Sequence, residues 1–334
     1  MNLEKNYTLS IVVPSYNASP YLKKCVESIY GEPFDERVYD VQVIIVNDGS
    51  KDNTIEIARE LESAYSDIIV IDKPNAGHGS CINCGIGAAT GKYLRVLDSD
   101  DWVEHDNFCE ALAKLRSCDE DLVSFDNYRY NISTQETSVQ TVGNIEYDKV
   151  LTADEFTVDF RIGLPNAHFK TEILKKIPKI DENCFYVDLE YIIYPVIHVK
   201  TFKAFTDQVY VYRVGDVNQS VSIESRIRNL KNMSRVIGSL SEFYNANSCK
   251  SAPSVNNYML NIIYGLFDDY CITVIMASKN KETVKTAKIN IKAWNKICPE
   301  LMKGSNKRKS AILCRYFPRF ILEMTEKIIK KRGK

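Results

Sequence analysis

Three aspartates, Asp98, Asp100 and Asp101, directly follow a short apolar segment at residues 94–97. The apolar residues predict a buried strand, and carboxylates beside a core cost free energy unless a positive charge pairs with them. Mg2+ or Mn2+ would be a suitable partner, because hard divalent cations prefer one or two carboxylates together with phosphate oxygens. A solvated loop whose last aspartate caps a helix at Trp102 explains the same residues, since aspartate is also a favoured N-cap.

Apolar segments that end in polar residues recur earlier in the chain. We predict strands at residues 9–14, 41–46, 68–71 and 93–97, with a helix between each pair. The second segment is apolar at nearly every position, as in parallel strands buried on both faces. This alternation predicts an α/β fold, a Rossmann-like doubly wound mixed sheet with polar loops at the carboxyl ends of the strands. No G-x-G-x-x-G follows the first strand, so the dinucleotide-binding fingerprint is missing.

The sequence changes character after Ser225. Before it we predict strands at 121–125, 167–170 and 209–213, a hairpin within 127–150 and a helix from Phe185 to Val196. After it we predict four helices, at 226–244, 255–277, 283–297 and 312–331. The apolar segment 258–277 contains Asp268 and Asp269, which are costly inside a membrane, so we predict a bundle or homodimer-interface helix. We therefore expect an α/β domain at 1–222 and a helical domain at 223–334.

The composition, 45% hydrophobic and 26% charged, is that of an ordinary globular protein. Ten cysteines are spread along the chain, and the polar residues 1–8 contain no signal peptide. We therefore expect a reducing, cytoplasmic location in which thiols serve as small apolar residues. The lone pair Cys81 and Cys84 is a weak metal signal without a second pair.

The end of the chain is strongly basic. Residues 303–334 contain eleven Lys or Arg and two Glu, a local charge of +9 in a chain whose net charge is −1. This asymmetry predicts a polyanionic partner, either a membrane surface or nucleic acid. Apolar residues recur at helical spacing among the basic ones, as in a helix that lies in a membrane interface. A solvated last helix packed on its neighbours fits equally, and Pro318 predicts a bend or a helix start.

Four loops together resemble those of the family-2 glycosyltransferases of the GT-A fold. They are Val-Pro-Ser-Tyr-Asn at 13–17, Val-Asn-Asp-Gly-Ser at 46–50, the loop 75–79, and Leu-Asp-Ser-Asp-Asp at 97–101. Their order and their places at strand ends match the family over roughly residues 8–220. The resemblance implies an inverting enzyme that uses Mn2+ or Mg2+ to move a hexose or N-acetylhexosamine from a UDP-sugar.

The resemblance implies that the first two loops hold uridine. Asp48 would accept the hydrogen bond from the base N3–H, Tyr16 would stack on or flank the ring, and Asn17 would line the same loop. Pro14 would fix the loop, because proline locks φ. By itself Asp48 in Asn-Asp-Gly-Ser is also a favoured turn residue.

The carboxylates take the remaining roles in the resemblance. Asp98-Ser99-Asp100 looks like the family's D-x-D element, in which Asp100 would ligate the metal and Asp98 would face the ribose or sugar. Asp188 matches the catalytic base that takes the acceptor's proton. Glu190 is the alternative base, and since residues two apart on a helix face different ways, we expect only one to reach the acceptor. Acids in a first helical turn also simply favour the helix dipole.

The sequence departs from the family in its third loop. Many relatives carry an arginine before the asparagine of this loop, and here Ile82 precedes Asn83. Gly77 and His78 are expected to substitute, with His78 donating to the phosphates. Arg213, followed by the polar loop at 218–220, looks like the segment that closes over the diphosphate, because its guanidinium can bind two oxygens.

We therefore expect a glycosyltransferase that acts on a glycan, lipid-linked at the inner face of the plasma membrane, with residues 303–334 touching the membrane surface. The alternative is a catalytically idle sugar-nucleotide-binding subunit that scaffolds a partner enzyme. A nucleotidyltransferase would show a glycine-rich basic loop after the first strand, which is absent. No nucleic-acid-binding motif is recognisable and the body of the chain is acidic, so no nucleic-acid partner is expected.

Overall fold

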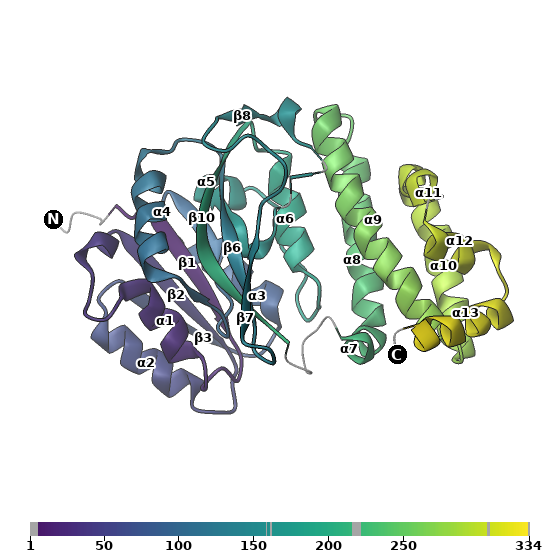
Figure 1. Cartoon of the computed structure of the whole chain (residues 1–334), viewed down its shortest axis with the longest axis horizontal. Helices are drawn as coiled ribbons and strands as arrows, with labels where there is room; N and C mark the ends of the chain where they lie inside the picture. Colours follow the sequence, from purple (N-terminus) through teal and green to yellow (C-terminus); the bar gives the residue numbers. More distant parts are fainter. Residues whose placement is uncertain (1–5, 158, 161, 216–221, 306–307, 333–334) are drawn as a thin grey trace. The chain divides into compact units, whose positions relative to one another are not determined.

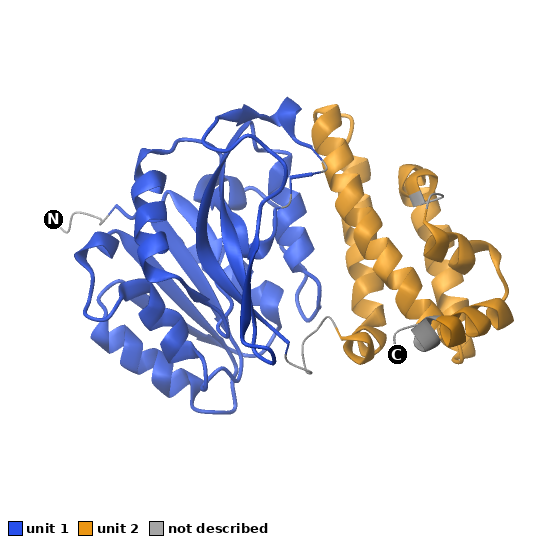
Figure 2. Cartoon of the chain, viewed as in Figure 1, with its two compact units in different colours: residues 1–216 blue, residues 217–334 orange. Residues whose placement is uncertain are grey.

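The computed structural model describes residues 6–157, 159–160, 162–215, 222–305 and 308–332. The chain forms two compact units, residues 1–216 and residues 217–334 (Figure 2). The boundary predicted from the sequence, between 222 and 223, lies six residues further along the chain.

A mixed sheet forms the centre of unit 1 (Figure 1). Its main path runs β3-β2-β1-β4-β9-β6-β10-β5. The first four strands in this path are parallel, and β9 is antiparallel to both of its neighbours. The strands are β1 (Leu9–Ser15), β2 (Val41–Asp48), β3 (Ile68–Lys73), β4 (Tyr93–Val96), β5 (Trp102–Val103), β6 (Leu122–Asn131), β7 (Glu136–Gln140), β8 (Leu151–Thr152), β9 (Ala167–Lys170) and β10 (Thr201–Val214).

Helices cover both faces of this sheet. On one face α1 (Leu22–Tyr30), α2 (Thr54–Ala64) and α4 (His105–Ser117) share a core with alternate strand residues such as Ile11 and Val43. On the other face α3 (His78–Ala88) packs so closely that a Cβ at Gly85 would lie 2.3 Å from Val12. The remaining helical segments of unit 1 are η1 (Glu36–Val38), η2 (Ala153–Glu155), η3 (Leu164–Asn166), α5 (Thr171–Leu174) and α6 (Asp188–Val196).

The predicted hairpin is confirmed, because β6 and β7 pair antiparallel from Asn127 opposite Gln140 to Asn131 opposite Glu136. The predicted start of α6 is wrong: the helix begins at Asp188 and not at Phe185. Tyr186 has φ +69°, a left-handed conformation that a right-handed helix cannot include. The strand predicted at 209–213 is the end of a longer one, β10.

The prediction that Asp101 caps a helix at Trp102 is also wrong. Trp102 and Val103 form the short strand β5, which pairs with β10. The helix α4 starts only at His105, and Glu104 caps it by accepting a hydrogen bond from the Asn107 N–H at 3.2 Å. The Asp101 carboxylate therefore does not cap a helix.

Unit 2 is helical, but it has more helices than the four predicted. They are α7 (Ile223–Arg228), α8 (Leu230–Asn247), α9 (Pro253–Met276), α10 (Lys281–Ile297), α11 (Pro299–Ser305), α12 (Lys309–Tyr316) and α13 (Arg319–Arg332). Proline explains two of the extra boundaries, because α11 begins at Pro299 and α13 begins directly after Pro318.

The helix α9 is long and apolar enough to span a membrane by length and composition, yet half of its most apolar stretch is buried inside the protein. It packs on α8, α10, α11, α12 and α13. Its two acids have partners within unit 2: Arg226 lies 2.8 Å from Asp269, and Arg308 lies 3.3 Å from Asp268. These contacts are those of a bundle helix, as expected from the sequence. All ten cysteines are free thiols, eight of them buried.

Candidate active site

Asp48 lies buried at the carboxyl end of β2, where it organises the next loop. Its Oδ1 accepts hydrogen bonds from Lys73 and from the Ala76 N–H (2.9 Å), and its Oδ2 accepts from the Gly77 N–H (2.8 Å). Burial raises the pKa of Asp48, but these hydrogen bonds outweigh it, so the pKa is lowered and the group is ionised. A carboxylate has about four lone-pair positions, so roughly one remains on Oδ2 for a further donor.

The first two predicted loops are joined to each other. The Asn17 N–H donates to Ser50 Oγ at 3.0 Å, and the Lys51 N–H donates to Asn17 Oδ1 at 2.8 Å. Asn17 has φ +49°, a left-handed turn that asparagine tolerates. Pro14 is buried within β1, and the Tyr16 side chain beside it is 49% exposed. The loop therefore presents an exposed aromatic ring while its backbone is held in place.

The glycines of the third loop allow a distant segment to approach. Gly77 has φ +86°, and a Cβ at Gly79 would lie 2.2 Å from the Asp181 carbonyl oxygen. The Asn183 N–H donates to the Ala76 carbonyl oxygen at 2.6 Å. The loop that follows β3 thus packs directly on the segment that leads into α6, which begins with Asp188.

His78 lies between those glycines and contacts the D-x-D element. Its Nε2 is 3.0 Å from Asp98 Oδ1. Burial lowers the pKa of His78, but the hydrogen bond with Asp98 and the charges of Asp98, Asp188 and Asp48 outweigh it, so the pKa is raised. The shared electrostatics show that these four side chains occupy one neighbourhood. The predicted contact of His78 with phosphates stays a prediction, since its partner in this structure is Asp98.

Asp100, the predicted metal ligand, points toward solvent. Its side chain is 43% exposed, and Arg213 Nη1 lies 3.7 Å from its Oδ2. The Arg213 guanidinium also lies over the Tyr21 ring, 4.7 Å from the centroid. Ser99, between the two aspartates, is half-buried. Arg213 therefore reaches the D-x-D loop from β10, whereas the segment 218–220 predicted to follow it lies outside the described residues.

Asp101 connects the D-x-D loop to β10 through buried hydrogen bonds. The Tyr210 hydroxyl donates to Asp101 Oδ2, and the Arg213 N–H donates to Asp101 Oδ1 at 2.7 Å. The same hydroxyl accepts the Asp98 N–H at 3.3 Å. Burial raises the pKa of Asp101, and the charges of Asp98 and Asp100 raise it further. Asp101 is thus a positioning residue that places Arg213 beside Asp100.

The two candidate bases differ sharply. Asp188 is exposed at the start of α6, while Glu190 is fully buried and accepts the Asp181 N–H at 2.7 Å. The protein atoms that surround Asp188 desolvate its carboxylate and raise its pKa, His78 lowers the pKa, and Asp98 raises it again. Of these two carboxylates only Asp188 is exposed, and its role as the base stays a prediction.

Asn83 is also predicted to contact the nucleotide-sugar donor, but its side chain contacts another segment of the protein. Its Nδ2 donates to the Ile180 carbonyl oxygen at 2.9 Å, and its Oδ1 accepts the Ile180 N–H at 3.0 Å. Nδ2 also lies 3.3 Å from Glu182 Oε1. These contacts are those of a residue that positions the segment before Asp188, and a role at the nucleotide stays a prediction.

Sequence reasoning missed Lys73, Tyr210 and Arg95. Lys73 ends β3 and pairs with Asp48, and an isolated lysine at a strand end carried no signal. Arg95 is fully buried in β4, donates to the Pro165 carbonyl oxygen at 2.9 Å and lies 5.0 Å from the Tyr210 ring centroid. Burial lowers its pKa to about 10. An arginine inside an apolar strand was the one available signal. The Arg95 guanidinium packs against the ring of Tyr210.

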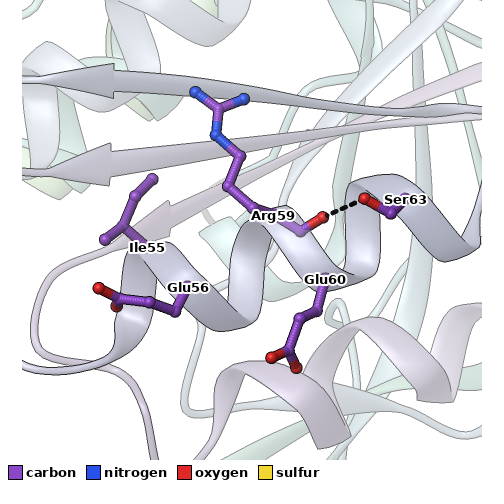
Figure 3. Close-up of a pocket in the computed structure, with 5 residues that line it drawn as sticks. All are labelled: Ile55, Glu56, Arg59, Glu60 and Ser63. Atoms are coloured by element: carbon purple, nitrogen blue, oxygen red, sulfur yellow. Dashed lines mark hydrogen bonds between the residues drawn. The ribbon is translucent and has the colours of Figure 1, made fainter.

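A surface pocket lies apart from these loops, on the outer side of α2 (Figure 3). It is lined by Ile55, Glu56, Arg59, Glu60 and Ser63. One helix supplies all five residues, and the hydrogen bond drawn among them, from Ser63 Oγ to the Arg59 carbonyl oxygen at 2.9 Å, is internal to that helix. Such a surface lacks the converging polar groups of a ligand site.

Comparisons with known proteins match the part of the chain that contains these loops. The profile of Glycosyl transferase family 2 matches residues 10–177. Glycosyltransferase GlyA of Streptococcus pneumoniae serotype 4 is 31% identical over 142 residues, which cover 42% of this chain and 20% of that protein. Chondroitin synthase of Pasteurella multocida is 39% identical over 98 residues, which cover 29% of this chain and 10% of the synthase. The chain thus spans a fifth or less of the length of these relatives.

Two solved structures share the fold at low identity. S. aureus TarS 1–349 in complex with UDP superposes with a TM-score of 0.55 and 15% identity, covering 98% of this chain and 92% of that one. The mannosyltransferase PcManGT from Pyrobaculum calidifontis, in complex with GDP-Man and Mn2+, gives a TM-score of 0.53 and 14% identity, covering 93% and 86%. The predicted fold, a GT-A sheet followed by a helical region, is confirmed.

Proposed function

Because the chain belongs to glycosyl transferase family 2, we propose that it is an inverting, metal-dependent glycosyltransferase that takes its sugar from a UDP-sugar. The observation that carries this proposal is the convergence of six side chains from the ends of β2 and β10, the D-x-D loop after β4, and the starts of α3 and α6: Asp48, His78, Asp98, Asp100, Asp188 and Arg213. We call this group the strand-end cluster. The charges of Asp48, Asp98 and Asp188 all act on His78, and Arg213 reaches Asp100, so the six share one site.

The donor half of the proposal rests on Asp48 and the exposed ring of Tyr16. The remaining lone pair on Asp48 Oδ2 can accept one N–H, as from the N3 position of uracil, while Tyr16 offers a face for stacking. The TarS structures bound to UDP and to UDP-GlcNAc show that this fold accommodates such donors, and PcManGT shows that it also accommodates GDP-Man. UDP is therefore the first donor to test and GDP the second.

The D-x-D residues fit a hard divalent cation. Asp98 and Asp100 offer carboxylate oxygens that reach solvent, which suits Mg2+ or Mn2+. When bound, the cation offsets charge on the departing nucleoside diphosphate as a Lewis acid. The planar guanidinium of Arg213 adds a positive charge that can bind two oxygens of the same diphosphate.

The acceptor half rests on Asp188. An inverting transfer needs one base that removes the acceptor proton as its oxygen attacks the sugar from the face opposite the diphosphate. Asp188 is exposed, whereas Glu190 is buried and accepts the Asp181 N–H, and the raised pKa of Asp188 makes it a stronger base than an ordinary aspartate. No covalent intermediate is required.

We further propose that the acceptor is a glycan held on a lipid at the inner face of the plasma membrane. The support comes from the basic end of unit 2, where Tyr316, Phe317, Phe320, Met324 and Ile328 expose large apolar side chains. Exposed apolar residues at helical spacing among basic ones suit an anionic membrane surface. Pelleting with vesicles of anionic lipid tests this, and loss of pelleting is expected for Phe320→Ser with Met324→Ser. Equal pelleting with neutral lipid would argue against the charge-driven contact.

Calorimetric binding of UDP in the presence of Mn2+, with and without EDTA, tests the donor site. We expect metal-dependent binding in the wild type and its loss in Asp100→Ala. Transfer from UDP-sugars to glycan acceptors then tests turnover. Binding without turnover would favour the idle subunit that scaffolds a partner, and failure of UDP to bind with metal present would reject the assignment of Asp48.

A further inference from the structure

Three potential metal ligands converge on one point outside the strand-end cluster. They are Asp35, which precedes η1, and His105 and Cys109, one turn apart on α4; we call them the Asp35 cluster. His105 Nε2 lies 3.2 Å from Asp35 Oδ2 and 3.6 Å from Cys109 Sγ, and Sγ lies 3.9 Å from Oδ2. From these three distances we propose that the Asp35 cluster binds Zn2+.

The separations suit a tetrahedral ion. Bonds of about 2.3 Å to sulfur and about 2.0–2.1 Å to nitrogen and oxygen place neighbouring ligand atoms roughly 3.3–3.6 Å apart. The three observed separations lie within a few tenths of an ångström of that range. A thiolate and an imidazole are soft and borderline ligands, which select zinc over Mg2+ or Mn2+, and zinc also accepts a carboxylate.

A contact outside the cluster orients the histidine for this role. His105 Nδ1 lies 3.2 Å from the Ser28 carbonyl oxygen, which can only accept, so Nδ1 carries a proton and Nε2 is the ring nitrogen available to a metal. Gly31 packs against the same ring, where a Cβ would lie 2.6 Å from Nε2. The imidazole is therefore held with Nε2 toward Asp35 and Cys109.

The same geometry argues against a nucleophilic role for Cys109. In a catalytic triad the histidine uses one ring nitrogen for the nucleophile and the other for the carboxylate. Here Asp35 and Cys109 both face Nε2, while Nδ1 is used by Ser28. Cys109 is also only 2% exposed, so a substrate would not reach its sulfur.

Arg37 competes with a metal ion for Asp35 Oδ2. Its Nε donates to Asp35 Oδ2 at 2.8 Å and its Nη2 lies 2.6 Å from the same oxygen, but Nη2 also lies 3.0 Å from Asp106 Oδ1. Arg37 thus keeps a carboxylate partner when a cation takes up Oδ2. The Cys109 thiol must lose its proton on binding, so zinc uptake releases a proton. Asp35 and His105 are partly exposed, which leaves room for water as a fourth ligand.

The test uses the full chain without a histidine tag, stripped of metal and titrated with Co2+ and then Zn2+. We expect one equivalent of Co2+ with a thiolate-to-cobalt charge-transfer band, displaced by Zn2+. Cys109→Ser should lose the band and bind Zn2+ at least about tenfold more weakly. Cys118→Ala is the matched control, because Cys118 is buried at the end of the same helix. Absence of a band in the wild type, or equal binding by Cys109→Ser, would overturn the proposal.

Two further readouts keep the test independent of how the variants fold. X-ray absorption of the zinc-loaded wild type should show one sulfur at about 2.3 Å, and a shell of only nitrogen and oxygen would reject the site. Asp100→Ala should retain the cobalt band, because Asp100 lies outside the Asp35 cluster. Loss of the band in that variant would overturn the proposal.

Discussion

Two histidines of unit 1 each pair with an aspartate, at nearly equal distances. His78 lies 3.0 Å from Asp98, and His105 lies 3.2 Å from Asp35. The third partner differs: Asp100 and Arg213 stand beside the first pair, and Cys109 stands beside the second. A hard, oxygen-rich neighbourhood suits a phosphate-bound cation, whereas a thiol suits zinc. The residues beside each His–Asp pair, and not the pair itself, therefore determine which metal ion the site suits.

The largest effect is expected from Asp188→Asn, which removes the base of the strand-end cluster. Sugar transfer should fall by about 10²–10⁴ while UDP binding is kept, since general-base catalysis contributes on that order. Steady-state kinetics and calorimetry measure the two quantities. Glu190→Gln is the comparison, and it should lower the unfolding temperature while kcat stays close to the wild-type value. The reverse pattern would make Glu190 the base.

Tyr210→Phe should weaken the support beneath the strand-end cluster. It leaves Asp101 Oδ2 buried without its hydroxyl donor, which should cost about 1–3 kcal/mol of unfolding free energy. Urea unfolding followed by Trp102 fluorescence, in a Trp294→Phe background, reports on unit 1 alone. Tyr212→Phe is the matched control on the same strand and should change little. Equal loss in both variants would mean that ring packing and not the hydroxyl is responsible.

The same substitution in each histidine pair separates the two sites. Asp98→Asn should weaken Mn2+-dependent UDP binding by about tenfold or more, because a hydrogen bond to a charged group is worth about 1.5–3 kcal/mol. Asp35→Asn should leave UDP binding unchanged and weaken the cobalt complex. Calorimetry and cobalt absorption of both variants complete the comparison. If each variant affects both readouts, the two sites are one coupled unit.

The smallest effect concerns pH. Asp188 must be ionised to act, so activity should be present above its raised pKa and should fall as the pH drops through it. His78 lowers the pKa of Asp188, so His78→Asn should move this acid limb of kcat/KM to higher pH. The pH profile with saturating metal measures the shift, and His198→Asn serves as the control. A shift to lower pH would show that His78 does not act on Asp188 as a positive charge.

Much of unit 1 could be predicted because its signals are local. Apolar runs such as 41–46 fix strands, and polar residues after each run mark the carboxyl edge where parallel strands meet. Asp98 and Asp100 were singled out in this way, whereas Asp48 was assigned through the resemblance to the family. The helices of unit 2 were harder to count, because Pro318 divides the helix predicted at 312–331 into α12 and α13, and α11 lies between two predicted helices.

The errors had particular physical causes. Asp101 satisfies the sequence pattern of a helix cap, but its oxygens are taken by Tyr210 and the Arg213 N–H from a strand 109–112 residues away. The start of α6 was misplaced because Tyr186 adopts a positive φ that its residue type does not predict. Long-range pairing also sets the contacts of Asn83 with Ile180, 97 residues apart, while its role at the nucleotide stays a prediction.

By itself, the sequence determined the order of strands and helices in unit 1 and the residue types at each strand end, because both follow from short-range periodicity. Only the tertiary structure decided which of those residues meet. His78 could have faced phosphate or Asp98, and Glu190 could have faced the acceptor or the core. Nothing local joins Asp35 to His105 and Cys109 across 70 and 74 residues. Such pairings depend on how helices pack on the sheet, and that packing is a property of the whole core.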